Sequence, residues 1–224
     1  MHDIRQKLLR KMRPDSFAAE GAKWQQQKSG QTRIKIFEAA IDCIVEHGYS
    51  RLSIAEISAR SGVSRGAMHH HFSGKMQLVA GLTDYLFYKR MDRFITDYFE
   101  VLGEDDKDFE IHATELHWRS VQTPEYAAYL EIMIAARTDQ QLADIFIPLS
   151  EKFDRVWHDE MVRDFPQWEG RVNALQLVSD FVTAAHMGLL LNQRSFGDGS
   201  RVQQVYDLIA ETVSRIRRLG KDGA

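Results

Sequence analysis

The chain of 224 residues contains little of what disulfide-bonded or membrane proteins use. Its single cysteine, Cys43, excludes an internal disulfide and fits a reducing cytoplasm. We interpret it as a small buried hydrophobe on a helix face rather than as a reactive thiol. No apolar run approaches the roughly 20 residues that span a bilayer, and the N-terminus lacks the apolar core of a signal peptide. We therefore expect a cytoplasmic protein with no membrane partner.

The sequence also lacks the period-two alternation of β-strands, whereas apolar residues recur at helical spacing along most of its length. The sequence predicts an all-α fold of about nine helices with an additional N-terminal segment. The first strong helix is expected at Thr32–His47. Pro124 suits the first turn of a helix, whereas Pro148 lies inside a predicted helix and should kink or split it.

The low net charge of −3 conceals a division along the chain. Residues 1–90 carry 15 Lys and Arg against 8 Asp and Glu, whereas residues 91–224 carry 14 against 24. A basic first part joined to an acidic remainder is typical of a DNA-binding head on a body that does not bind DNA. The basic residues 1–30 could be either a mobile tail or an arm that contacts phosphates or the minor groove.

Residues 52–78 contain the most informative motif. Ser53, with Glu56 three residues later, predicts a capping box and a helix that starts at residue 54. Gly62 suits the left-handed exit from that helix, and Ser64 can cap the next one. Two short helices joined by a turn of three to four residues that contains glycine are the signature of a helix-turn-helix.

This motif resembles the tetracycline-repressor-type (TetR) transcriptional regulators, although only the first third of the chain carries the resemblance. The matching positions are Ser53, Ile57, Gly62, Val63, Ser64, Gly66, His71, Phe72, Lys75 and Leu78. The departures from the family pattern are Ser53 for Thr, Ser58 and Ser61 for Ala, and Met68-His69 for Leu-Tyr. The serines are compatible in size, whereas His69 replaces a tyrosine that often touches DNA in this family and therefore bears on the operator sequence.

The second helix of the motif should enter the major groove with its N-terminal residues. Arg65 can form forked hydrogen bonds to guanine, Gly66 permits close approach of the backbone, and Ala67 can touch a thymine methyl. His69 and His70 are the longer polar side chains on the expected exposed face. The resemblance implies that Ser53, His71 and Lys75 hold phosphates, together with amides at the N-termini of the second and fourth helices. Ser64 is a further candidate DNA contact.

The same stretch contains patterns of two other chemistries. Consecutive histidines on a helix point about 100° apart, so His69, His70 and His71 cannot converge on one metal ion, and we expect neither a metal nor another cofactor. Gly62 to Gly66 matches the Gly-x-Ser-x-Gly pattern of serine hydrolases. That pattern requires a strand before the serine, whereas here a helix is expected, so we do not predict an enzyme.

The remainder of the chain is expected to bind a small effector and to form a dimer. Large apolar and a few polar residues suit a small-molecule pocket, although each residue alone fits an ordinary core equally well. The candidate pocket residues are Phe94, His117, Trp118, Tyr126, Tyr129, Met133, Phe146, Trp157, His186 and Met187. The resemblance implies that the last two helices pair with those of a second subunit. The candidate interface residues are Leu175, Val178, Phe181, Val182, Ala185, Leu189, Val202, Val205, Tyr206, Ile209, Val213 and Ile216.

The sequence therefore predicts three parts: a basic N-terminal extension (1–30), a helix-turn-helix DNA-binding domain (31–77), and a helical effector-binding and dimerisation domain (78–224). The expected protein is a bacterial, nucleoid-associated homodimer that represses transcription from a palindromic DNA operator and is released by a small lipophilic or aromatic molecule. Two alternatives stay open. One is a structural or cell-division factor of the same fold without an effector, and the other is an activator.

Overall fold

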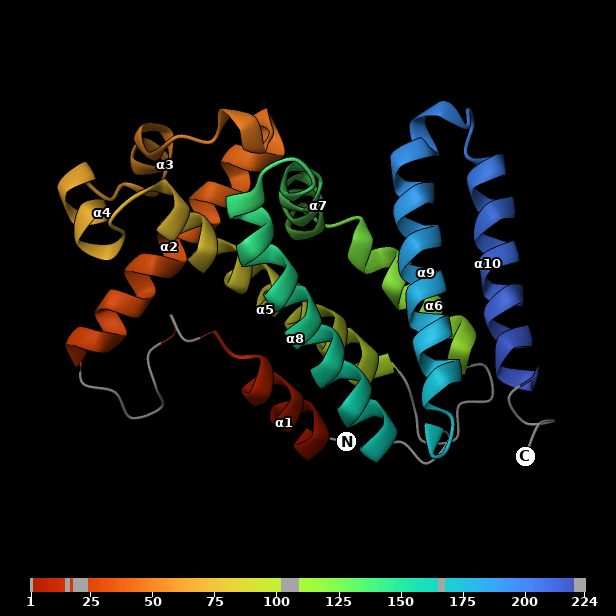
Figure 1. The fold of residues 1–224 in the computed structure, drawn as a ribbon. Helices are drawn as coiled ribbons and strands as arrows, with labels where there is room; N and C mark the ends of the chain where they lie inside the picture. The colour runs from red at the N-terminus through yellow and green to blue at the C-terminus, as the bar shows by residue number, and fades with distance from the viewer. Residues whose placement is uncertain (1, 15–16, 18–23, 102–108, 165–167, 220–224) are drawn as a thin grey trace. The chain divides into compact units, whose positions relative to one another are not determined.

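The computed structural model describes residues 2–14, 17, 24–101, 109–164 and 168–219, and within these residues it contains ten α-helices and no strand (Figure 1). The all-α prediction is confirmed. The helices are α1 (His2–Met12), α2 (Trp24–His47), α3 (Ile54–Ser61), α4 (Arg65–His71), α5 (Lys75–Val101), α6 (Phe109–Val121), α7 (Pro124–Ala136), α8 (Gln140–Asp164), α9 (Val172–Asn192) and α10 (Ser200–Leu219). Short 3-10 turns follow α2 at Tyr49–Arg51 and α9 at Gln193–Ser195.

The chain divides into two compact units. The head unit comprises residues 9–91 and 124–153, and thus contains α2, α3, α4 and α7 with the first parts of α5 and α8. The body unit comprises residues 1–8, 92–123 and 154–224, and contains α6, α9 and α10. The division predicted at residues 30 and 77 stays a prediction, although α2 runs through residue 30 as one helix.

Aromatic side chains join the first helix of the head unit to the helices around it. The Phe37 ring on α2 lies 5.6 Å from the Phe72 ring and stacks on Tyr85 of α5 at 5.4 Å. A Cβ at Gly81 would lie 2.9 Å from a ring carbon of Phe37, so α5 approaches α2 this closely only because that position is glycine. Phe72, which follows α4, therefore packs against the aromatic rings of α2 and α5.

An ionic cluster next to Tyr85 joins three helices of the head unit. The Lys89 ammonium on α5 lies 2.6 Å from Glu38 Oε2 on α2 and 3.0 Å from Glu125 Oε1 on α7. Tyr85 donates a hydrogen bond to Glu38, and burial and this carboxylate both raise the pKa of the Tyr85 phenol. Because the cluster links three helices, it fixes α2 relative to α5 and α7.

Residues 2–12 form a helix that packs against other parts of the chain. On α1, Leu8 is fully buried, Arg5 donates to Thr96 Oγ1 at 2.9 Å, and the Lys7 ammonium lies 3.3 Å from Glu160 Oε2. The mobile-tail interpretation is therefore wrong for residues 2–12, whereas residues 15–16 and 18–23 lie outside the described part.

The helix expected at Thr32 begins earlier, at Trp24.

Pro148 does not split the helix that contains it. The structure has one continuous α8 from Gln140 to Asp164, with Pro148 inside it. The expected split at this position is therefore not found, whereas a kink at Pro148 stays a prediction.

The body unit has its own core, in which Tyr98, Leu116, Met161, Trp168 and Leu175 are buried together. Helices α9 and α10 lie side by side and both contact α6 (Figure 1).

One helix of the body unit corrects an expectation from the sequence. Residues 172–195 form a helical segment that is long and apolar enough to cross a membrane by length and composition, so the expectation that no such stretch exists is wrong. The cause is that α9 is apolar on two faces, with Leu175, Val182 and Leu189 buried while Leu177 and Leu191 are exposed.

Candidate nucleic-acid interface

The turn between α3 and α4 is formed by local hydrogen bonds that the sequence specifies. Gly62 adopts a left-handed conformation with φ 69° at the end of α3. The hydroxyl of Ser58 donates to the Val63 carbonyl at 2.6 Å, and the Val63 amide donates to Ser61 Oγ at 3.2 Å. Two of the serines at which the chain departs from the family pattern therefore stabilise the turn.

Serine side chains cap both helices of the motif. The amide of Glu56 donates to Ser53 Oγ, and the amide of Ala67 donates to Ser64 Oγ, each at 3.2 Å. The expected capping box is only half formed, because the Glu56 carboxylate lies 3.1 Å from His47 Nε2 on α2 instead. Helix α3, which should lie over the DNA backbone, is thus tied to α2.

Helix α4 buries one side and exposes the other. Met68 is buried with 2% of its surface exposed, and Phe72, which follows the helix, is buried with 6%. Arg65, Gly66, His69 and His70 are exposed. Of the other predicted DNA contacts, Ser53, Ser64 and Lys75 are exposed, whereas Ala67 and His71 are half-buried. Residues 64–71 therefore present a surface to solvent, which the predicted role requires.

Two features make this surface suitable for DNA. No hydrogen bond or ion pair within the described residues engages the Arg65 side chain, so its forked guanidinium is available to a base. Burial lowers the pKa of His71, and the neighbouring Arg33 and His70 side chains add to the effect. His71 should therefore act as a neutral hydrogen-bond donor at pH 7.

Gly66 has no structural reason to be glycine within the chain. A Cβ at this position would meet no atom within 4 Å, and its φ is not positive. A helical glycine costs up to about 1 kcal/mol relative to alanine. Close approach of the helix backbone to DNA, which the sequence predicts, would explain why residue 66 is glycine.

The residues predicted to line an effector pocket separate into two groups. Phe94, His117, Trp118, Trp157, His186 and Met187 belong to the body unit, whereas Tyr126, Tyr129, Met133 and Phe146 belong to the head unit. In the body, His117 Nδ1 lies 2.9 Å from His186 Nδ1, and the His186 ring stacks on Tyr206 at 6.0 Å. Their role in effector binding stays a prediction.

Sequence reasoning did not identify Arg90, which lies at the centre of the head-unit group. Its guanidinium carbon lies 3.7 Å from the Tyr129 ring centroid and 4.5 Å from that of Tyr126. The position of Arg90 one residue after Lys89, on a long helix, gave no signal in the sequence alone.

The residues predicted to form a dimer also face in different directions. Leu175, Val182, Leu189, Ile209 and Val213 are buried within their own chain. Val205 is 37% exposed, and Val178, Phe181, Ala185, Val202, Tyr206 and Ile216 are half-buried. Leu177, Leu191 and Leu208, which were not predicted, are 55–61% exposed.

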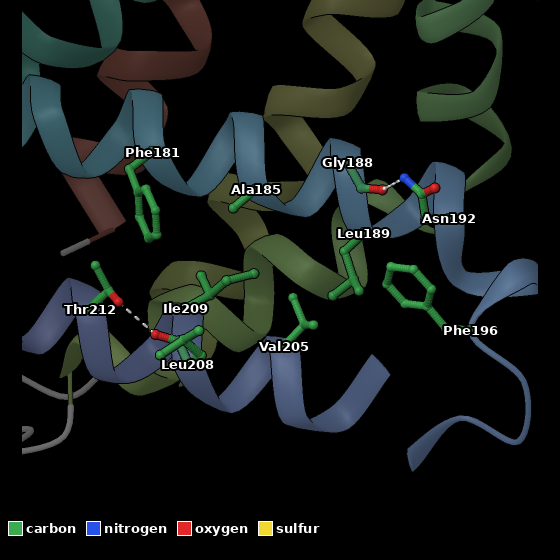
Figure 2. A pocket seen from close by; sticks show the side chains of 10 residues that line it. All are labelled: Phe181, Ala185, Gly188, Leu189, Asn192, Phe196, Val205, Leu208, Ile209 and Thr212. Atoms are coloured by element: carbon green, nitrogen blue, oxygen red, sulfur yellow. Dashed lines mark hydrogen bonds between the residues drawn. The ribbon is translucent and has the colours of Figure 1, made fainter. Parts of the chain in front are cut away.

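A groove of about 450 Å³ lies between α9 and α10 on this exposed side (Figure 2). Phe181 and Ala185 of α9 and Val205, Leu208 and Ile209 of α10 line it. Its few polar groups bond locally: Asn192 donates to the Gly188 carbonyl and Thr212 to the Leu208 carbonyl, each at 2.8 Å. The walls are therefore left almost entirely apolar.

An exposed recognition helix on a capped helix-turn-helix defines a DNA-binding transcriptional regulator. Residues 36–82 match the family model described as "Bacterial regulatory proteins, tetR family". An uncharacterised HTH-type transcriptional regulator of Mycobacterium tuberculosis is 30% identical over 139 residues, which cover 62% of this chain and 70% of that protein. The chain belongs to the tetR family.

Two further similarities extend beyond the head. The HTH-type transcriptional repressor AcnR of Corynebacterium diphtheriae is 26% identical over 182 residues, covering 81% of this chain and 90% of that protein. The structure of the multidrug binding protein EbrR complexed with imidazole matches with a TM-score of 0.59 and 15% identity, covering 83% and 89% of the two chains. The relatives from Mycobacterium tuberculosis and Corynebacterium diphtheriae are named as transcriptional regulators and not as enzymes.

Proposed function

We propose that this regulator is a homodimeric repressor, that it acts in the cytoplasm on a palindromic operator, and that a small lipophilic or aromatic effector releases it. The observation that carries the proposal is the exposed surface of α4, where Arg65, His69 and His70 face solvent. The similarity to AcnR, which is named a repressor, supports the direction of control. The similarity to EbrR, which is named a multidrug binding protein, supports a small effector.

The apolar groove supports the dimer. Single exposed apolar residues are ordinary, but Val205 and Leu208 on α10 are exposed and both line one continuous apolar groove. A second copy with the same groove would cover it around a two-fold axis. A two-fold pair of chains would also carry two recognition helices, which a palindrome requires.

Release would follow from linkage between effector and DNA. Two recognition helices must lie roughly 34–36 Å apart, or a multiple of that distance, to occupy successive major grooves. An effector that prefers another setting of the heads lowers the affinity for DNA only by its difference in affinity between the two settings. Helix α5 carries Lys75 at its start and Arg90 about four turns later, so a single helix joins the DNA surface to the aromatic residues.

The test selects bound duplexes from a random DNA pool with the full-length protein, and then measures binding by gel shift and mass by light scattering. We expect an enriched inverted repeat, a complex with two chains, and binding that weakens as salt increases. Selection of no sequence, or binding by a single chain to an asymmetric site, would overturn the proposal.

A further inference from the structure

Arg90 lies between aromatic rings of the head unit. Its guanidinium carbon is 3.7 Å from the Tyr129 ring centroid, 4.5 Å from that of Tyr126, and 6.0 Å from that of Phe87. Arg90 and Phe87 belong to α5, and the two tyrosines to α7. The distance to Tyr129 is that of a planar cation lying directly over the ring.

The rings around Arg90 hold one another in place. Tyr129 lies 5.2 Å from Phe87, 5.4 Å from Tyr126 and 5.4 Å from Phe146, measured between ring centroids. Phe87, Tyr126 and Phe146 are buried, whereas Arg90 and Tyr129 are half-buried. The accessible part of this aromatic site is therefore the guanidinium and the ring beneath it, and both are pre-organised by packing.

The charge of Arg90 is not compensated within the described residues. Its neighbour Lys89 has two carboxylates within 3.0 Å, those of Glu38 and Glu125. No carboxylate of the described residues pairs with Arg90, whose contacts are with aromatic rings. A half-buried cation without an anion retains most of its desolvation cost, so an added anion would be stabilised there.

We propose that Arg90 and Tyr129 bind an aromatic carboxylate, which identifies the class of effector for the regulator proposed above and rests on that proposal. A guanidinium whose carbon lies 3.7 Å from the Tyr129 ring centroid can keep N–H groups at its edge for two parallel hydrogen bonds to a carboxylate. The ring of the ligand would contact Tyr129 and Met133, which lies one turn later on α7 and is half-buried.

The surrounding charges favour a carboxylate over other ions. An organic cation would compete with Arg90 for the same rings and would bring two positive charges together. A phosphate dianion would meet the cluster of Glu38, Glu125 and Lys89, which carries one excess negative charge. A monoanion with an aromatic ring can pair with the Arg90 guanidinium and meets less repulsion from this cluster than a dianion would.

The same two helices could transmit binding to the DNA surface. Arg90 follows Lys89 on α5, and Tyr126 follows Glu125 on α7. Lys89 and Glu125 belong to the ionic cluster that also holds Glu38 of α2. An anion bound to Arg90 would therefore act on the turns of α5 and α7 that carry Lys89 and Glu125. The ionic contacts of these turns hold α2, the first helix of the DNA-binding head.

The test uses 2-naphthoate as the probe and 2-naphthamide as its neutral isostere, each titrated calorimetrically into the full-length protein. We expect 2-naphthoate to bind at least about tenfold more tightly than the amide, because charge-assisted hydrogen bonds are the stronger ones. Arg90→Gln should remove that difference, and Arg90→Lys should retain part of it. Arg137→Gln, at an exposed arginine that follows α7, is the matched control and should change nothing.

Equal affinity for the two probes, or absence of binding of 2-naphthoate to the wild-type protein, would overturn the inference without any variant. Unchanged affinity in a folded Arg90→Gln protein would also overturn it. A gel shift on the selected operator without any probe separates the two proposals. If the protein binds DNA but not 2-naphthoate, only the effector class is wrong, whereas failure to bind DNA removes the regulator proposal itself.

Discussion

The backbone amide of Tyr49 donates a hydrogen bond to Glu131 Oε2 at 3.1 Å, across 82 residues of sequence. Tyr49 begins the short turn between α2 and the helix-turn-helix, and Glu131 lies on α7. Gly48, just before it, has φ 80° and ψ 158°, a conformation that is essentially restricted to glycine. The Lys75 ammonium lies 5.4 Å from the centroid of the Tyr49 ring. The entry to the DNA-binding motif is therefore held by α7 and by the start of α5.

Removal of the Glu131 side chain should loosen this turn. We expect Glu131→Ala to lower the free energy of unfolding by about 1 kcal/mol, since water can partly replace the acceptor at this exposed residue. Amide exchange at Tyr49 should accelerate. Glu131→Gln keeps a carbonyl acceptor and is the control. If the two variants exchange at the same rate at Tyr49, the hydrogen bond does not hold the turn.

Arg65 and Lys75 should affect DNA binding in different ways. Arg65→Ala should weaken binding to the selected operator by about 1–3 kcal/mol and relax the preference at one base pair, because it removes a base contact. Lys75→Ala should weaken all sequences alike and lower the salt dependence by about one charge. Gel shifts at several salt concentrations, on operator and on scrambled DNA, distinguish the two. An equal loss on both DNAs for Arg65→Ala would assign that residue to the phosphates.

Gly66→Ala separates stability from DNA binding. The added methyl meets nothing within the chain, so the variant should unfold at the same or a higher temperature, with a gain of up to about 1 kcal/mol. The operator affinity should nevertheless fall by about tenfold or more, since the methyl would keep the helix away from the groove. Thermal unfolding and gel shift are measured on the same preparation. A more stable variant with unchanged affinity would show that the DNA does not approach this backbone.

The DNA-binding motif could be predicted from the sequence because short-range interactions define it. The caps at Ser53 and Ser64 and the left-handed Gly62 depend on neighbours within five residues, and each is found as expected. The start of α2 was placed eight residues late because Gly30 and the polar residues before it resemble a linker, whereas the structure continues the helix through them. The tendency of glycine to interrupt helices is small enough for packing to override it.

The aromatic site around Arg90 could not be predicted, because it depends on which faces of α5 and α7 meet. The sequence identified Tyr126, Tyr129 and Phe146 as aromatic residues but gave no reason to bring them to one arginine. The sequence also did not show which apolar face of α9 is buried and which is exposed. Its apolar residues occupy more than one face, so a periodicity argument identified Leu175, Val182 and Leu189, which are buried, and missed Leu177 and Leu191, which are exposed.

His186 should make the stability of the protein sensitive to mild acid. Its side chain is fully buried and its Nε2 has no hydrogen-bond partner within the described residues, and burial lowers its pKa from 6.5 to about 4. The unfolded chain therefore takes up this proton near pH 6.5, whereas the folded chain takes it up only near pH 4. Stability should be unaffected by His186 above pH 7 and should decrease as the pH falls between these values, by up to about 3 kcal/mol.

Urea unfolding of wild type and His186→Phe at pH 7.5, 6, 5 and 4.5 measures this contribution, with the exposed His69→Gln as the control. The other facing groups, His117 and Tyr206, are retained in all three proteins. The decrease in stability with acid should be smaller in His186→Phe than in the other two proteins. Parallel pH profiles for all three would mean that His186 titrates normally in the folded state.

Leu208 provides the strongest test of the proposed dimer surface, because it is the most exposed of the leucines along the groove, at 61%. Leu208→Glu should leave the fold of the single chain intact, since the side chain already faces solvent. In a dimer the carboxylate would be buried against an apolar partner, which costs several kcal/mol, so the dissociation constant should rise by about 100-fold or more. Ile147→Glu, at an exposed isoleucine on α8 (52%), is the matched control and should not change the mass. Sedimentation equilibrium over a range of concentrations measures both variants. A Leu208→Glu protein that remains as dimeric as the wild type would place the subunit interface elsewhere, and the exposed residues of α9 and α10 would then need another partner.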